Sequence, residues 1–232
     1  MTDFLLLHDA EQIAAEAEPA VKPGLARVFA GMVRRPAEVL AEAFAHPIQS
    51  YAVILAAAGG VYWTLNAAIA QAGGDAVSLP VTLAAILLVG IPAGVGYLFA
   101  FSILINWACD ILGGQPTRKK VRVTLAYAGV PGIIALALFG LPKILIFGQS
   151  LFLQGRPWMS ANPALVWGLW FGDALCFAWS WLLVVKALKI MNGFSTGKAI
   201  AAAALPLGPI LLIGMLFLAI VWGGVFLAPP AF

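Results

Sequence analysis

Charged side chains are scarce in this chain of 232 residues, because Asp, Glu, Lys and Arg make up only 10% of it. A soluble domain carries roughly 25% charged residues. Histidine and cysteine are rarer still, with two of each. This composition leaves no room for a soluble catalytic domain or a disulfide framework, and we expect Cys109 and Cys176 to be small buried hydrophobes. We also expect no catalytic residue, cofactor or metal, because no nucleophile has a base and no ligand cluster has suitable spacing.

Hydrophobic residues are correspondingly abundant. They make up 62% of the chain, and the mean hydropathy is +0.99. Five apolar runs follow residue 46, at about 47–70, 79–112, 121–147, 164–185 and 199–227. Each run reaches the ~20 residues that a helix needs to cross a bilayer. We therefore predict an all-α integral membrane protein whose residues 47–232 form a five-helix membrane domain.

Two short regions precede the first predicted span. Residues 1–20 contain five carboxylates and no cation, which indicates an acidic cytoplasmic segment. Within residues 21–46, four apolar side chains share one helix face, namely Leu25, Val28, Phe29 and Met32. The pattern predicts an amphipathic interfacial helix whose Arg27, Arg34 and Arg35 meet anionic lipid head groups. A helix packed on the protein's own spans is the alternative.

The cations are distributed unevenly along the chain. A dense cluster separates the second and third apolar runs and consists of Arg118, Lys119, Lys120 and Arg122. With the N-terminus in the cytoplasm, 11 of the 13 cations lie on the cytoplasmic side, and only Lys143 and Arg156 lie on the other. The positive-inside rule then predicts a cytoplasmic N-terminus and an external C-terminus. The net charge of +3 reflects this loop asymmetry and does not indicate nucleic-acid binding.

A short motif connects the chain to a known family. Gly113 and Gly114 follow the second run, and Tyr127 lies four residues before Pro131 early in the third run. This pattern, together with an Arg-Arg-Pro-Ala-Glu-Val segment before the first run, resembles the Yip domain family of Ypt-interacting polytopic membrane proteins. The resemblance implies a five-span bundle without catalytic activity. It also implies partners, because eukaryotic relatives act in vesicle trafficking with small GTPases and with proteins of the same family.

The short cytoplasmic arm and the bacterial style of the chain argue against a GTPase partner and for a bacterial-type member in the cytoplasmic (inner) membrane. Two function classes stay open. The first is a non-enzymatic protein that organises membrane or partner proteins through lipid and helix-helix contacts, as a homo-oligomer or as an accessory subunit of a larger complex. The second is a transporter or permease component.

Three charged residues near or inside the spans carry further predictions. Asp173 lies about nine residues into the fourth run, where an unpaired carboxylate costs ~2.5 to 3.5 kcal/mol at full depth. We expect it to form a structural ion pair with Lys143, and the alternative is a polar path for a proton or small solute near Asp173. Asp110, at the inner end of the second run, is expected to pair with the cations of the cluster at 118–122.

Overall fold

The fold is described from a computed structural model, in which residues 24–45, 51–72, 74–75, 77–209 and 215 are described. Every regular element in these residues is a helix, which confirms the predicted all-α class there. The elements in chain order are α2 (Leu25–Arg34), α3 (Pro36–Ala45), α4 (Ala52–Gln71), α5 (Leu79–Ile111), α6 (Arg118–Ala128), α7 (Val130–Ala135), the π-helix η1 (Leu136–Gly140), α8 (Leu141–Phe147), the 3₁₀-helix η2 (Gly148–Phe152), α9 (Trp158–Ala161), α10 (Pro163–Asn192) and α11 (Thr196–Ala204).

Four helical stretches are long and apolar enough to cross a membrane. They are α4, α5, the run Arg118–Phe152 from α6 to η2, and α10. These stretches match four of the five predicted spans. The fifth, at 199–227, begins within α11, but residues 210–214 and 216–227 lie outside the described residues. The five-helix count therefore stays a prediction.

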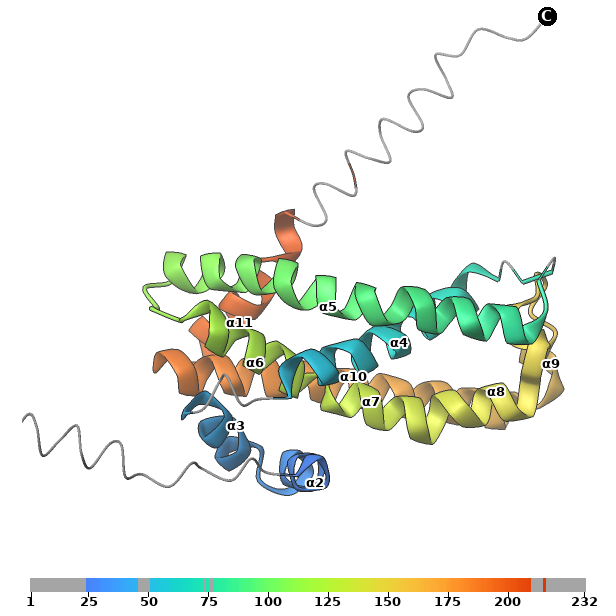
Figure 1. Ribbon diagram of the computed structural model, residues 1–232, viewed down its shortest axis with the longest axis horizontal. Helices are drawn as coiled ribbons and strands as arrows, with labels where there is room; N and C mark the ends of the chain where they lie inside the picture. Colours follow the sequence, from blue (N-terminus) through green and yellow to red (C-terminus); the bar gives the residue numbers. More distant parts are fainter. Residues whose placement is uncertain (1–23, 46–50, 73, 76, 210–214, 216–232) are drawn as a thin grey trace, which may run out of the picture.

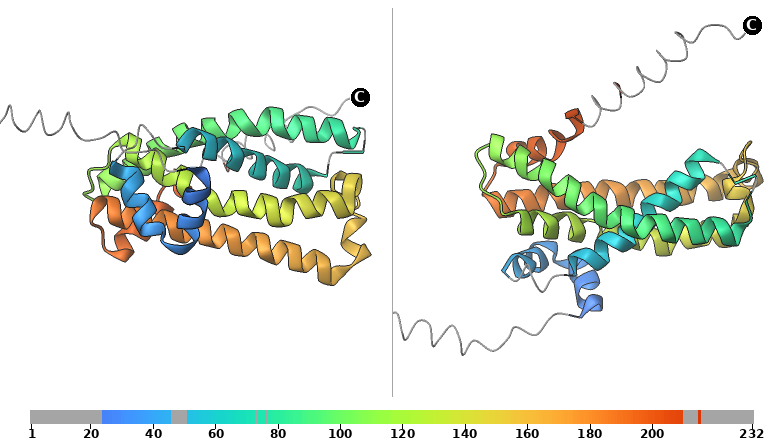
Figure 2. Two further views of the ribbon diagram at one scale, coloured as in Figure 1. Left: turned by 60° about the horizontal axis from the view of Figure 1, so that its bottom comes forward. Right: turned by 45° about the horizontal axis from the view of Figure 1, so that its top comes forward.

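The first two spans form the closest helix pair. Helices α4 and α5 pack against each other; they lie next to each other in the left view of Figure 2 and cross at an angle in Figure 1. A Cβ atom added to Gly60 would lie 2.5 Å from the Cα atom of Gly94, and one added to Gly90 would lie 2.8 Å from the Cα atom of Val61. Only glycine permits this backbone contact. Small residues at four-residue spacing are the usual means of close helix approach in lipid, and α5 provides such a pair.

The third span is interrupted twice along its length. Helix α6 ends before Gly129, and α7 starts there with Pro131 in its first turn. The π-turn η1 then precedes Pro142, which lacks the N–H that an α-helix would use and whose ring crowds the preceding turn. Widening to a π-turn is one way in which a helix in lipid accommodates such a residue. The second interruption lies against α10, which α7 and η1 both contact.

The N-terminal helices lie crosswise to the bundle. Figure 1 shows α2 end-on while the spans run across the page, and α3 connects it to α6 and α10. A helix is therefore present where the amphipathic one is predicted. Part of its apolar side faces the protein, because Val28 and Met32 are 1% and 0% exposed and pack in a core cluster with Leu40 of α3 and Leu55 of α4, whereas Leu25 is 38% exposed. The alternative, packing on the protein's own helices, is correct for these two residues.

Two helices extend beyond the ends of their apolar runs. The basic cluster at 118–122, which separates two apolar runs in the sequence, forms the first turns of α6. Helix α10 continues past the predicted end at 185 to Asn192, where Gly193 adopts a left-handed φ of 64°. Caps and glycines set these ends, whereas hydropathy reports only where the apolar run ends.

Candidate functional site

The most unusual feature inside the spans is a buried ion pair. The Nζ atom of Lys143 in α8 lies against the Oδ2 atom of Asp173 in α10, and the two side chains are 2% and 9% exposed. A lone charge at this depth is costly, and pairing reduces that cost. The structure thus brings together the two residues that the sequence predicts to meet.

Two neighbours in α10 shape the environment of this pair. The Nζ atom of Lys143 lies 4.2 Å from the centroid of the Trp170 ring, which is within cation-π range. Gly172 lies directly against the ring of Phe139 in η1, and a Cβ atom there would overlap it. The π-turn can therefore approach α10 closely at the level of Asp173.

A tyrosine from a third helix lies beside the pair. Tyr62 of α4 is 7% exposed, contacts Gly132 of α7 with its ring, and lies near Asp173 and Cys176 of α10. The second carboxylate oxygen of Asp173, Oδ1, is buried and has no hydrogen-bond partner within the described residues. The pair, its unsatisfied oxygen and the tyrosine form a small polar cluster surrounded by apolar side chains.

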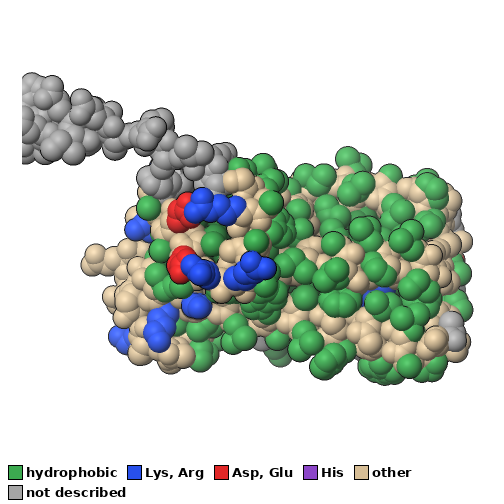
Figure 3. Space-filling view, turned by 90° about the horizontal axis from the view of Figure 1, so that it is seen from below, with side chains coloured by type: hydrophobic (Ala, Val, Ile, Leu, Met, Phe, Trp, Pro, Cys, Tyr) green, Lys and Arg blue, Asp and Glu red, His purple; other side chains and the backbone are tan. Residues whose placement is uncertain are grey.

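The second candidate site is the basic end of the bundle. Figure 3 shows Lys and Arg side chains gathered at one end, next to a largely apolar surface that covers the rest of this face. The exposed or half-exposed cations of this end are Arg27, Arg34, Arg35, Arg118, Lys119, Lys120, Arg122, Lys186, Lys189 and Lys198. Glu38 lies 3.6 Å from Arg35, and both side chains are more than 70% exposed, so this contact contributes little to stability. We call the end of the bundle that carries these ten cations the basic end.

One predicted contact at this end is not observed. Asp110 does not pair with the cluster at 118–122; among the described residues its carboxylate accepts a hydrogen bond of 3.0 Å from Asn106. Asn106 is one helical turn away, so its amide reaches Asp110 along the surface of α5. Arg122 instead turns toward the spans, with its guanidinium carbon 4.7 Å from the Phe99 ring centroid.

The glycine pair of the family motif fixes the connection between α5 and α6. Gly113 has a φ of 82°, which favours glycine. A Cβ atom on Gly114 would lie 2.7 Å from both Asn192 and Phe194, so this residue packs against the end of α10.

The tyrosine and proline of the motif lie further along the third span. Tyr127 is 2% exposed within the core cluster that contains Leu40 and Val28. Pro131 is buried in the first turn of α7. The motif residues therefore have packing roles around α6.

Comparison with known proteins agrees with this motif. The model of the Yip1 domain matches residues 21–227. The chain belongs to the Yip1 domain family. No curated protein and no solved structure matches it. The Yip1 domain family is a membrane protein family not known as enzymatic, and this chain is a multi-pass membrane protein with several apolar helices. Within the described residues, no group of three His, Cys, Asp or Glu side chains could bind a metal.

Proposed function

We propose that this member of the Yip1 domain family is a non-enzymatic protein of the bacterial inner membrane that organises anionic lipids and partner membrane proteins at its basic end. The proposal includes a cytoplasmic N-terminus and an external C-terminus, since 10 of the 12 described cations lie at the basic end and only Lys143 and Arg156 lie elsewhere.

The observation that carries the proposal is the position of three cations at the start of α6. Arg118, Lys119 and Lys120 are its first three residues. The N-terminus of a helix carries partial positive charge, and each like charge there is unfavourable by about 0.3 to 1 kcal/mol. No acidic side chain lies in this turn to offset the charge. A negatively charged surface outside the protein would stabilise these cations, and the phosphates of lipid head groups provide such a surface.

Partner contact would use surfaces other than Gly60 of α4 and Gly90 and Gly94 of α5. These three glycines are already buried in the contact between the two helices. One face of α10, by contrast, exposes Trp167, Phe171 and Leu175 at four-residue spacing, with 70%, 66% and 55% of each side chain accessible. This ridge is suited to either lipid chains or the apolar helix of a neighbouring protein.

The test compares the full chain with two variants changed at Arg118, Lys119 and Lys120. In one variant all three become Gln, and in the other the charge is kept by Arg118→Lys, Lys119→Arg and Lys120→Arg. We expect the Gln variant to retain less phosphatidylglycerol in native mass spectrometry and to lose proteins that crosslink to the wild-type chain in membranes. The charge-conserving variant should keep both. Equal lipid retention by all three chains would contradict the proposal.

The buried polar cluster favours a second candidate, a transporter component with a polar path near Asp173. An unsatisfied carboxylate oxygen beside a tyrosine is a feature that proton and solute paths share. Asp173→Asn in proteoliposomes tests this candidate. Loss of a pH-dependent flux in a folded variant would support it, and absence of flux from the wild-type chain would count against it.

A further inference from the structure

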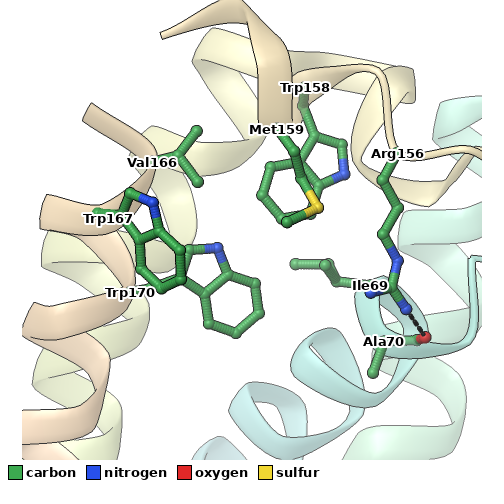
Figure 4. A pocket seen from close by; sticks show the side chains of 8 residues that line it. All are labelled: Ile69, Ala70, Arg156, Trp158, Met159, Val166, Trp167 and Trp170. Carbon is green, nitrogen blue, oxygen red and sulfur yellow. Dashed lines mark hydrogen bonds between the residues drawn. The ribbon is translucent and has the colours of Figure 1, made fainter. Parts of the chain in front are cut away.

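An aromatic pocket lies at the end of the bundle opposite the basic end. Its volume is about 230 Å³, and its walls are formed by Trp158 and Met159 of α9, by Trp167 and Trp170 of α10, and by Ile69 of α4. Figure 4 shows the Trp167 and Trp170 rings facing Ile69 and Met159 across the opening, with Arg156 along the rim. A water occupies ~30 Å³ of liquid, so the pocket has room for about eight waters or for a segment of one acyl chain. Cavities with apolar walls favour the chain.

Interfacial tryptophans are common in membrane proteins and need no ligand. Trp167 fits that description, because it is 70% exposed. Trp158 does not, because it is 5% exposed and its indole Nε1 is buried without a hydrogen-bond partner. A buried donor without an acceptor is unfavourable. Because that nitrogen is also closed off from the pocket, Trp158 contributes the apolar surface of its ring to the pocket wall.

The rim also provides a cation that is only partly used. Arg156 donates one hydrogen bond of 2.9 Å from Nη2 to the carbonyl oxygen of Ala70, near the C-terminus of α4. A guanidinium has five N–H donors in a fork that matches phosphate, so four remain. A cation at the rim and an apolar slot inside it thus lie next to each other.

We propose that this pocket binds one acyl chain of an anionic phospholipid, with the phosphate at Arg156. A phospholipid carries a phosphate close to its acyl chains, which matches a cation at the rim of an apolar slot. The second acyl chain stays in the bilayer, because the pocket has no room for it. This inference extends the lipid-contact part of the proposed function to a defined site at the other end of the bundle.

The experiment uses the full chain in phosphatidylcholine vesicles and measures quenching of tryptophan fluorescence by dibrominated lipids. Bromine quenches only tryptophans that it touches. We expect dibrominated phosphatidylglycerol to quench more, and at a lower mole fraction, than dibrominated phosphatidylcholine. Ala70→Phe fills the pocket and should remove this excess, whereas Ala67→Phe, on the same helix and outside the pocket, should keep it.

The head-group assignment is tested by a second matched pair. Arg156→Gln should weaken the phosphatidylglycerol effect about tenfold, because a charge-assisted hydrogen bond is lost. Arg118→Gln removes the same charge at the basic end and should leave the pocket signal unchanged, which separates this inference from the proposed function. Equal quenching by the two lipids in the wild-type chain, or unchanged quenching in Ala70→Phe, would overturn the proposal. Removal of the signal by Ala70→Phe but not by Arg156→Gln would overturn the phosphate assignment.

Discussion

The backbone of Gly60 in α4 lies directly against the backbone of Gly94 in α5, and a Cβ atom on Gly94 would lie 2.8 Å from the Cα atom of Gly60. The preceding glycine of the same helix has different surroundings. Gly59 has open space around the position of its missing Cβ atom. Of these two adjacent glycines, Gly60 makes the contact with α5 and Gly59 does not. An added methyl group should therefore disturb the helix pair only at Gly60.

The first prediction uses this difference. Gly60→Ala should destabilise the bundle by about 1 to 3 kcal/mol, because α4 and α5 must separate to admit the methyl group. Gly59→Ala should leave stability unchanged or raise it by up to about 1 kcal/mol, since alanine favours helix. Thermal unfolding of the two variants in the same detergent measures both effects. A shared, equal loss of stability would contradict the close contact.

Much of this fold follows from the apolar runs. An apolar run of about 20 residues in a bilayer has essentially one solution, a helix, because its backbone must satisfy its own hydrogen bonds. The predicted span 79–112 thus differs from the observed α5, Leu79–Ile111, by one residue. The predicted end of α10 and the predicted start of α6 are wrong by several residues. Lys186, Lys189 and Arg118 lie on helical turns that extend beyond the apolar region.

The second prediction concerns the packing of α2. Met32 is fully buried, whereas its neighbour Val33 is 51% exposed. Met32→Asp should destabilise the protein by about 3 to 5 kcal/mol, because it leaves an uncompensated buried charge. Val33→Asp should change stability by no more than about 0.5 kcal/mol. Thermal unfolding in detergent distinguishes this packing from a helix that lies on lipid, for which Met32→Asp would release lipid without lowering the melting temperature.

The third prediction tests the proposed orientation of the spans. In a chain with Cys109 and Cys176 replaced by alanine, single cysteines are placed at Gln115 and Gln154, which are both exposed. A membrane-impermeant thiol reagent should label the cysteine at 154 in intact cells and the cysteine at 115 only after the membrane is opened. Labelling in opened membranes at both positions serves as the control. The reverse pattern would refute a cytoplasmic N-terminus.

The candidate sites divide in the same way into predictable and unpredictable parts. Asp173 and Lys143 could be predicted as partners, because two isolated charges inside apolar runs lower their cost by meeting. Tyr62 and Trp158 could not, since the sequence does not tell how far each helix is rotated about its axis. The glycines of α5 at 90 and 94 carried a signal in their four-residue spacing, but their partner helix was visible only in the structure.

The last prediction concerns the ion pair. Asp173→Ala should leave Lys143 buried without a counter-ion and destabilise the protein by about 3 to 5 kcal/mol. Lys143→Ala should have a similar effect on the carboxylate. The double variant should recover much of either loss, because neither charge is then left unpaired. Thermal unfolding of the four chains gives the coupling free energy.

The exposed pair Arg35 and Glu38 provides the matched control. The same cycle there should give a coupling below about 1 kcal/mol, since solvent screens both groups. A large coupling for the buried pair together with a small one for the exposed pair identifies Lys143 and Asp173 as a structural unit. If the two single losses at the buried pair simply add, the residues act independently. Asp173 would then be free to serve a polar path, and a flux that disappears in Asp173→Ala and stays absent in the double variant would support that role over the structural one.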